Sequence, residues 1–154
     1  MTKSMKTTQK DTLGTLFQDV ARLRINCYGS LLRSIDLTPT QSLVILALLE
    51  EEGVIQGDLA RTLGIRAVTL GGVVDRMEAG GWLERRPDER DRRAKRIWLT
   101  PAGRELEDAI REALKAVHEI AIDDLPGGDV DRLYDTLVAI RANLLDYRER
   151  EDSA

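Results

Sequence analysis

The sequence is poor in the residues that build covalent or metal-bound scaffolds. It contains one cysteine, Cys27, and one histidine, His118, among 154 residues. A lone cysteine forms no intramolecular disulfide, and one cysteine with one histidine does not supply the ligands of a structural zinc site. The composition therefore excludes a disulfide scaffold and a zinc fold of the usual kind, and we expect no metal or cofactor.

Long hydrophobic runs and aromatic residues are also scarce. The longest apolar run covers residues 43–49, far short of the ~20 residues that span a bilayer. The N-terminal residues MTKSMKTTQKDT contain no apolar segment, aromatics make up 4% of the chain and proline occurs four times. These features predict a cytoplasmic, mainly helical globular protein without a membrane partner.

Charge is distributed unevenly along the chain. The net charge is -4, from 23 Lys+Arg and 27 Asp+Glu. Residues 85–96, RRPDERDRRAKR, nevertheless hold seven basic and three acidic side chains, so a short positive segment interrupts an acidic protein. Such a segment favours binding of a polyanion at one place, whereas the alternative is a solvated loop whose charges pair with one another.

Helical periodicity predicts long elements at both ends of the chain. Apolar residues at intervals of three and four form a stripe along residues 12–35. Thr100 and Pro101 combine a capping residue with a proline and open a helix that ends at residues 126–128. Asp129 then caps a last helix, which also carries an apolar stripe.

The central residues predict a helix-turn-helix. Thr38 and Gln41 stand at the positions of a capping box, which opens a helix that stops near Gly53. Residues 58–64 and 65–79 have the pattern of two short helices, each closed by glycine. Two short helices joined by a glycine-containing turn form the DNA-binding helix-turn-helix motif.

A β-hairpin is expected directly after this motif. Residues 82–85 and 96–100 are typical of two short strands, so the basic segment between them becomes the tip of a wing. The expected fold class is mainly α with a small β-hairpin wing, and all 154 residues form a single domain. A winged helix-turn-helix module covers about residues 38–100, and helices from about 11–36 and 101–148 form a dimerisation platform.

The apolar faces of the terminal helices need a partner. A module of three helices and a wing already has its own core, so the terminal stripes stay unburied unless something else covers them. A homodimer in which these helices pack around a two-fold axis is the economical solution. The alternative is a monomer whose terminal helices fold back onto their own module.

Four stretches of the chain resemble a known family. They are LTPTQ at residues 37–41, DLARTLGI at 58–65, VVDRMEAGGWLERR at 73–86 and DRRAKRIWLTPAGRE at 91–105. The chain resembles MarR-type winged-helix transcription regulators over nearly its whole length, and SlyA-like members in particular. The resemblance implies a triangular homodimer that binds palindromic double-stranded DNA as a sequence-specific regulator. The alternative is a helical protein-interaction module that keeps the fold without specific DNA binding.

The resemblance places the recognition helix over residues 66–76. Such a helix fits the major groove, where Thr69 can donate to a base edge or a phosphate and Ala67 or Val68 can touch a thymine methyl. Arg76 is better placed for a phosphate. The candidate DNA-contacting residues of this helix are Arg66, Ala67, Val68, Thr69, Gly72 and Arg76.

The resemblance assigns further DNA contacts to the wing. Arg93 falls where the family has the arginine that enters the minor groove, and Asp91 where it has the aspartate that steadies the wing. The remaining basic residues supply charge for the phosphate backbone. The candidate residues of the wing are Arg90, Asp91, Arg92, Arg93 and Lys95, with Arg96 beside them.

Two positions depart from the family pattern. Relatives commonly have arginine at position 72, whereas Gly71 and Gly72 lie in the middle of this recognition helix. Each interior glycine costs roughly 1 kcal/mol in helix propensity, so the pair either permits close approach to DNA or is a tolerated weakness. Arg66 replaces the usual small polar residue at the start of the same helix.

Two residues of the first helix suggest a ligand site. Family members often bind small amphipathic or anionic aromatic molecules between the platform and the winged module. Arg24 and Tyr28, one helical turn apart, are candidates for a carboxylate and an aromatic ring, with a surface ion pair and interface packing as the alternatives.

Other chemically reactive features are weak. We expect Cys27 to be a buried, inert thiol on the apolar stripe. No glycine-rich phosphate loop, nucleophile elbow or paired-histidine motif occurs in the sequence, so an enzyme is not expected.

Overall fold

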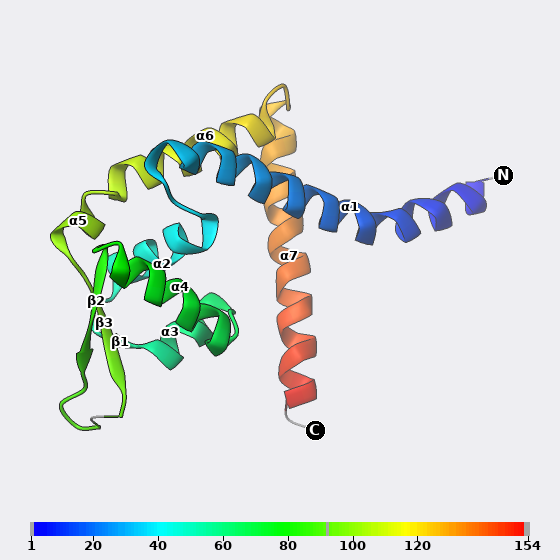
Figure 1. Cartoon of the computed structure of the whole chain (residues 1–154). Helices are drawn as coiled ribbons and strands as arrows, with labels where there is room; N and C mark the ends of the chain where they lie inside the picture. Colours follow the sequence, from blue (N-terminus) through cyan, green and yellow to red (C-terminus); the bar gives the residue numbers. More distant parts are fainter. Residues whose placement is uncertain (1, 92, 153–154) are drawn as a thin grey trace. The chain divides into compact units, whose positions relative to one another are not determined.

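The computed structural model describes residues 2–91 and 93–152 (Figure 1). Its elements are α1 Thr2–Leu32, the 3-10 helix η1 Arg33–Ile35, α2 Pro39–Glu50, β1 Val54–Ile55, α3 Gln56–Leu63, α4 Ala67–Ala79, β2 Leu83–Pro87, β3 Lys95–Leu99, α5 Pro101–Arg104, α6 Glu107–Ile122 and α7 Gly127–Asp152. The predicted mainly α class with a small β wing is confirmed. The chain divides into two compact units, residues 1–117 and 118–154.

The first helix differs from the predicted range of residues 12–35 at both ends. It begins at Thr2, and its last turn tightens into η1 after Leu32. Asp36 then adopts a left-handed conformation with φ 55°, and its N–H donates to the Arg33 carbonyl over 3.2 Å. This reversal ends the helix before Pro39 opens α2.

Both predicted threonine caps are confirmed. The Thr38 hydroxyl accepts from the Gln41 N–H over 3.3 Å, and the Gln41 side chain accepts from the Thr38 N–H over 2.8 Å, which completes the capping box. The Thr100 hydroxyl likewise accepts from the Gly103 N–H over 3.1 Å.

The long helix expected after Thr100 is wrong in one respect, because it breaks into α5 and α6 at residues 105–106. The first segment is attached to the end of the hairpin: the Thr100 N–H donates to the Trp82 carbonyl over 3.1 Å. The second segment, α6, buries one apolar face, which includes Ile110 and Val117. The helix breaks because α5 is fixed to the hairpin, whereas α6 packs its own apolar face into the core.

The sheet is antiparallel, with strand order β1-β3-β2. β3 pairs with β2 from Leu83 opposite Leu99 to Pro87 opposite Lys95, and with β1 through Val54 opposite Ile97. The hairpin strands lie within two residues of their predicted bounds. The strand β1 was not predicted, because a two-residue strand has no measurable alternation of apolar and polar residues.

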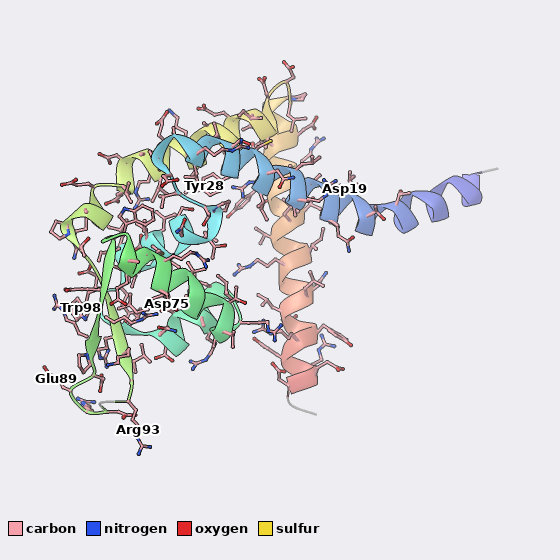
Figure 2. All side chains as sticks on the ribbon, viewed as in Figure 1. Asp19, Tyr28, Asp75, Glu89, Arg93 and Trp98 are labelled. Atoms are coloured by element: carbon pink, nitrogen blue, oxygen red, sulfur yellow. The ribbon has the colours of Figure 1, made fainter. Side chains whose placement is uncertain are left out.

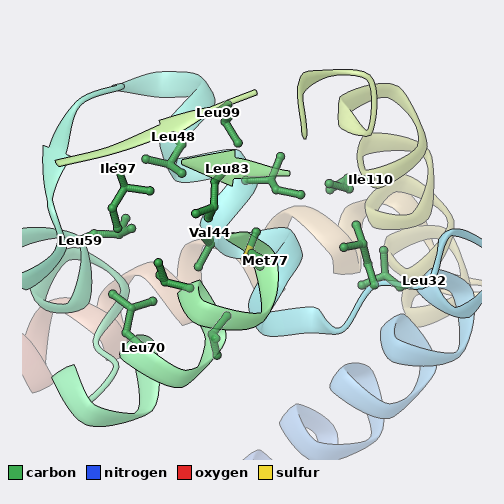
Figure 3. Close-up of a cluster of buried hydrophobic side chains, with 14 of the residues drawn as sticks. Leu32, Val44, Leu48, Leu59, Leu70, Met77, Leu83, Ile97, Leu99 and Ile110 are labelled. Atoms are coloured by element: carbon green, nitrogen blue, oxygen red, sulfur yellow. The ribbon is translucent and has the colours of Figure 1, made fainter. Parts of the chain in front are cut away.

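The core of the first unit lies between the helices and one face of the sheet (Figure 3). Its largest fully buried side chains are Leu32, Ile45, Leu48, Leu70, Met77, Leu83, Ile97 and Ile110. They come from α1, α2, α4, both hairpin strands and α6. The core thus fixes the helix-turn-helix against the root of the wing.

The helix α7 belongs to the second unit and begins two residues before the predicted cap at Asp129. None of its described residues is buried. Its exposed large apolar side chains are Leu133, Tyr134, Leu137, Val138, Leu144, Leu145 and Tyr147. The division of the protein into a winged module and a platform stays a prediction.

Candidate nucleic-acid interface

The helix-turn-helix consists of α3 and α4. Gly64 closes α3 in a left-handed conformation with φ 63°, and the Ile65 N–H donates to the Ala60 carbonyl over 2.9 Å. Glycine adopts this backbone conformation without the penalty that a Cβ imposes. The turn therefore sets the direction of α4, the predicted recognition helix.

α4 has a buried face and an open face. Leu70, Val73, Val74 and Met77 are buried in the core, whereas Arg66, Ala67, Val68 and Thr69 are exposed. Arg66 holds the N-cap position in an extended conformation and makes no side-chain cap hydrogen bond with the described residues. The N–H groups of the first turn, together with the Arg66 charge, suit a phosphate.

The middle of the open face carries little side-chain bulk. Gly72 is half-buried and Arg76 is exposed, and a Cβ built on Gly72 would lie 3.7 Å from Nη1 of Arg76. A Cβ on Gly71 would lie 3.6 Å from Nε2 of Gln56. Both are ordinary van der Waals distances, so the fold of the chain does not require glycine at either position.

The tip of the wing is held by Asp88. This residue is 5% exposed, and its Oδ1 accepts from the N–H groups of Arg90 and Asp91, both over 2.8 Å. Its Oδ2 accepts from Nε of Arg96 on β3. The N–H of Asp91, then the Arg96 guanidinium and the N–H of Arg90, lower the pKa of the Asp88 carboxyl. Asp88 therefore stays ionised and ties the loop to the strand.

Asp91 makes the second connection within the loop. Its Oδ1 accepts from the Arg93 N–H over 2.9 Å, and its carbonyl accepts from the Ala94 N–H over 2.9 Å. Figure 2 shows Arg93 at the tip of the hairpin, with its side chain directed away from the strands. The arginine expected to enter the minor groove is thus presented outward by a hydrogen-bonded loop.

The basic segment contains arginines that the protein neutralises itself. Arg85, 18% exposed, contacts Asp75 over 2.6 Å and Glu78 over 2.7 Å, and its Nε donates to Gln56 over 3.2 Å. Arg86 pairs with Glu84 and lies over the Trp98 ring at 5.0 Å from its centroid. Arg96 pairs with Asp88.

The other basic side chains of the segment are open. Arg90, Arg93 and Lys95 are exposed, and no ion pair between described residues includes them. Arg92 lies outside the described residues. The two interpretations of the basic segment, self-paired charges and anion binding, therefore each apply to part of it. The arginines on the strands are paired within the chain, and the open cations at the tip can bind an anion.

The residues predicted from the sequence to form the site did not include Asp88, Arg85 or the acidic partners of Arg85. Asp88 carried a usable signal, because an aspartate that follows proline often accepts from N–H groups two and three residues later. Arg85 carried none, since its partners Asp75 and Gln56 lie 10 and 29 residues away.

The two candidate ligand residues differ in exposure. Arg24 is exposed, whereas Tyr28 is 4% exposed and packs in the core. The Tyr28 hydroxyl donates to Oγ of Ser42 over 2.9 Å, and burial raises the pKa of the phenol. The structure does not bring the two side chains together on one accessible surface.

Cys27 corrects an expectation. We expected a buried thiol, but Cys27 is exposed in the single chain: α1 turns Tyr28 and Leu32 toward the core, and Cys27 lies about 100° around the helix from Tyr28. Among the described residues, no three or more His, Cys, Asp or Glu side chains gather as they would around a metal ion. No single described helix is long and apolar enough to cross a membrane; residues 12–35 with α2 meet that criterion only as a pair bent by 77°.

Known transcription regulators are similar to this chain in sequence. Residues 35–94, which cover the helix-turn-helix and most of the wing, match the model of the MarR family. The transcriptional regulator SarZ of Staphylococcus haemolyticus is 29% identical over 125 residues, 80% of this chain and 82% of that protein.

Solved structures extend the likeness beyond the module. A MarR-family transcriptional regulator from Rhodococcus sp. is 30% identical, with a TM-score of 0.74 over 85% of this chain and 93% of that one. A MarR variant from E. coli complexed with operator DNA has a TM-score of 0.76 and 22% identity, over 83% of this chain and 92% of that one, which shows a shared fold. With its winged helix-turn-helix and these relatives, the chain belongs to the MarR family, whose members are DNA-binding transcription regulators and not enzymes.

Proposed function

We propose that the protein acts as a homodimer on palindromic operators and regulates transcription by sequence-specific binding of double-stranded DNA. The observation that carries this proposal is the set of open cations at the wing tip, Arg90, Arg93 and Lys95, in the same unit as the exposed start of α4. A helix that reads bases beside a basic wing that holds the backbone is a known mode of duplex recognition.

The exposed apolar side chains support the dimer. On α1 they are Leu13, Leu16, Phe17, Val20, Leu23 and Ile25, and α7 carries a comparable set. Large apolar faces that a single chain leaves in water mark an interaction surface, and a two-fold axis covers identical faces with one another. Two winged modules related by that axis would meet half-sites about one helical turn apart.

The contacts divide by what they recognise. Arg93 enters the minor groove, where a narrow groove has an enhanced negative potential. Arg90, Arg92, Lys95 and Arg76 bind phosphates, which fixes the position of the protein but carries no sequence information. Thr69 at the exposed start of α4 contacts a base edge.

A regulatory ligand is a smaller part of the proposal. We propose a small aromatic carboxylate whose anion meets Arg24, the exposed member of the candidate pair. Since Tyr28 is buried and its hydroxyl is already used, it would line such a site from within the core. Benzoate titrated into the wild type should raise the melting temperature, and Arg24→Ala should abolish that rise.

The experiment selects duplexes from a random library with the full-length protein and measures binding at several salt concentrations. We expect a palindromic consensus and an affinity that falls steeply with salt, because phosphate contacts release counterions. Arg93→Ala should weaken binding by about tenfold or more, and Thr69→Ala should weaken the selected duplex more than a random one.

The alternative, a protein-interaction module without specific DNA binding, makes the opposite prediction. No consensus would emerge from the library, and the variants would bind duplexes like the wild type while remaining folded. That result would remove the proposed function.

A further inference from the structure

The start of α4 exposes an apolar side chain that none of the described residues covers. Val68 is 86% exposed, and no other large apolar side chain among the described residues is as open. Its neighbours Ala67 and Thr69 are exposed as well, and each carries a methyl group. The groove-facing end of the helix is therefore a small apolar surface.

Hydrogen-bonding side chains are few on the same face. Between Ala67 and Val74, Thr69 is the single residue with a polar side chain. Asp75 comes next, but its carboxylate is held by Arg85 over 2.6 Å. The face thus offers neither the amide that pairs with adenine nor a free carboxylate that accepts from cytosine.

Gly71 and Gly72 leave the middle of the open face of α4 without side chains, although the packing of the chain does not require glycine at either position. A Cβ at Gly71 or Gly72 would make ordinary contacts with the ends of flexible side chains, and neither glycine has a positive φ. Glycine weakens a helix interior, so its presence twice in succession points to an outside surface that comes close to the backbone. Arg66 and Arg76 flank this bare strip, which suits a polyanion.

We infer that α4 recognises thymine through its 5-methyl group, with Val68 as the side chain that contacts it. The thymine methyl is the apolar feature of the major groove, and small apolar side chains are its natural partners. Gly71 and Gly72 let the helix lie deep enough for Val68 to make this contact. The inference rests on the proposed function, because it assumes that α4 enters the groove of duplex DNA.

The test compares duplexes that differ by a methyl group. Selected duplexes are synthesised with deoxyuridine in place of thymidine, one position at a time, and their affinities for the full-length dimer are measured. At one position in each half-site, loss of the methyl should lower the affinity by about fourfold per half-site. Placing 5-methylcytosine opposite guanine at a non-thymine position serves as a control, since it adds a methyl elsewhere in the groove.

Val68→Ala assigns the contact to its side chain. This variant should bind the thymidine duplex about fourfold less tightly per half-site and the deoxyuridine duplex as the wild type does, because the partner methyl is already absent. Arg93→Ala is the matched control: it should weaken both duplexes equally and leave their ratio unchanged.

Gly72→Ala tests close approach. Its melting temperature should equal or exceed that of the wild type, since alanine favours the helix, while its affinity for the selected duplex falls at least fivefold. An unchanged affinity would show that the glycine pair is not needed for docking and would overturn that part of the inference.

The failures of the two proposals are distinguishable. If no duplex is selected at low salt, the proposed DNA function itself fails. If a duplex is selected but the wild type binds its thymidine and deoxyuridine forms equally at every position, DNA binding stands and methyl recognition is wrong. If the preference for thymidine persists in Val68→Ala, the assignment to Val68 is wrong.

Discussion

The winged module and the terminal helices differ in how many of their apolar and charged side chains are buried or paired within the chain. In residues 39–99 most large apolar side chains are buried in one core, with Val68 as the main exception, and three arginines of the basic segment are paired internally. Helix α7 has no buried residue, and most of the apolar groups of α1 from Leu13 to Ile25 are exposed. Most apolar groups of the module are therefore buried within the chain, with help from Leu32 of α1 and Ile110 of α6, whereas the apolar faces of α7 and of α1 before Tyr28 stay exposed in the single chain.

This contrast separates residues that maintain the fold from residues that serve contacts. Substitution of a side chain that is buried or paired within the chain affects function indirectly, through the stability of the fold or the position of an element. An open group affects function directly and leaves the single chain intact. The same distinction runs through the basic segment, where Arg85 is engaged and Arg93 is free.

The largest expected effect is on the open apolar stripe of α7. Leu137→Asp should convert a dimer of about 35 kDa into a monomer of 17.3 kDa or unfold it, because an unpaired charge in a covered apolar interface costs roughly 3 kcal/mol or more. Light scattering at micromolar concentration measures the mass.

Ala139→Asp is the matched control for this substitution. It places the same charge about 200° around the helix from Leu137, away from the stripe, and should leave the mass unchanged. A wild-type protein that is monomeric at micromolar concentration would contradict the comparison itself, because the terminal stripes would then have no partner.

At α5, where the chain leaves the hairpin, Gly103→Ala should lower stability without changing the mass. A Cβ at Gly103 would lie 2.0 Å from the Trp82 carbonyl oxygen and 3.0 Å from its carbon, and backbone atoms cannot rotate away. We expect a loss of about 1–3 kcal/mol in the free energy of unfolding, measured by denaturation at fixed protein concentration. Gly57→Ala, where a Cβ meets nothing within 4 Å, should be neutral.

The sequence allowed the local features of the fold to be predicted. Thr38, Thr100 and Gly64 mark element ends through bonds to residues at most four positions away, so spacing alone revealed them. The strand β1 exists because Val54 meets Ile97 across the sheet. A contact over such a distance in sequence leaves no local pattern, and the same holds for the break between α5 and α6.

In the candidate interface, too, contacts between residues distant in sequence could not be predicted. The family resemblance placed Val68 and Thr69 at the groove-facing start of the recognition helix, and both are exposed in the structure, whereas the buried positions of α4 recur every three or four residues. Sequence charge did not distinguish Arg85 from Arg93, since pairing depends on where α4 and β2 meet in space. The basic segment was thus located correctly, but its division into paired and free halves required the structure.

Arg85 provides the sharpest test of that division. Arg85→Met removes the guanidinium that pairs with Asp75 and Glu78 on the recognition helix, so their uncompensated charges should repel DNA and lower the affinity by about tenfold. Adding Asp75→Asn and Glu78→Gln to this variant should restore most of the affinity. Binding assays at one salt concentration measure both.

Arg86→Met is the control on the same strand. Arg86 pairs with Glu84 instead and is exposed, so its loss should change the affinity by no more than about twofold. If the Arg85→Met defect persists without the two carboxylates, then Arg85 acts through the position of the wing and not by masking charge.

The smallest expected effect concerns the Asp88 carboxylate in the wing. Its pKa is held below the ordinary value of 3.8, so the folded loop favours the ionised form. The contribution of this group to wing stability is therefore complete above the ordinary value and is lost as the pH falls through the lowered one. Between pH 5 and 8 the amide NMR signals of Arg90 and Asp91 should stay fixed, and they should move only in more acidic solution.

Asp88→Asn should uncouple the loop from Arg96 at every pH. The amide oxygen can still accept from the two loop N–H groups, but the ionic contact is lost, so the affinity for DNA should fall by about twofold to threefold. Glu89→Gln, its exposed neighbour, should do nothing. Movement of the wild-type Arg90 and Asp91 signals between pH 5 and 8, absent in Asp88→Asn, would mean that the Asp88 carboxylate is not held ionised by its neighbours.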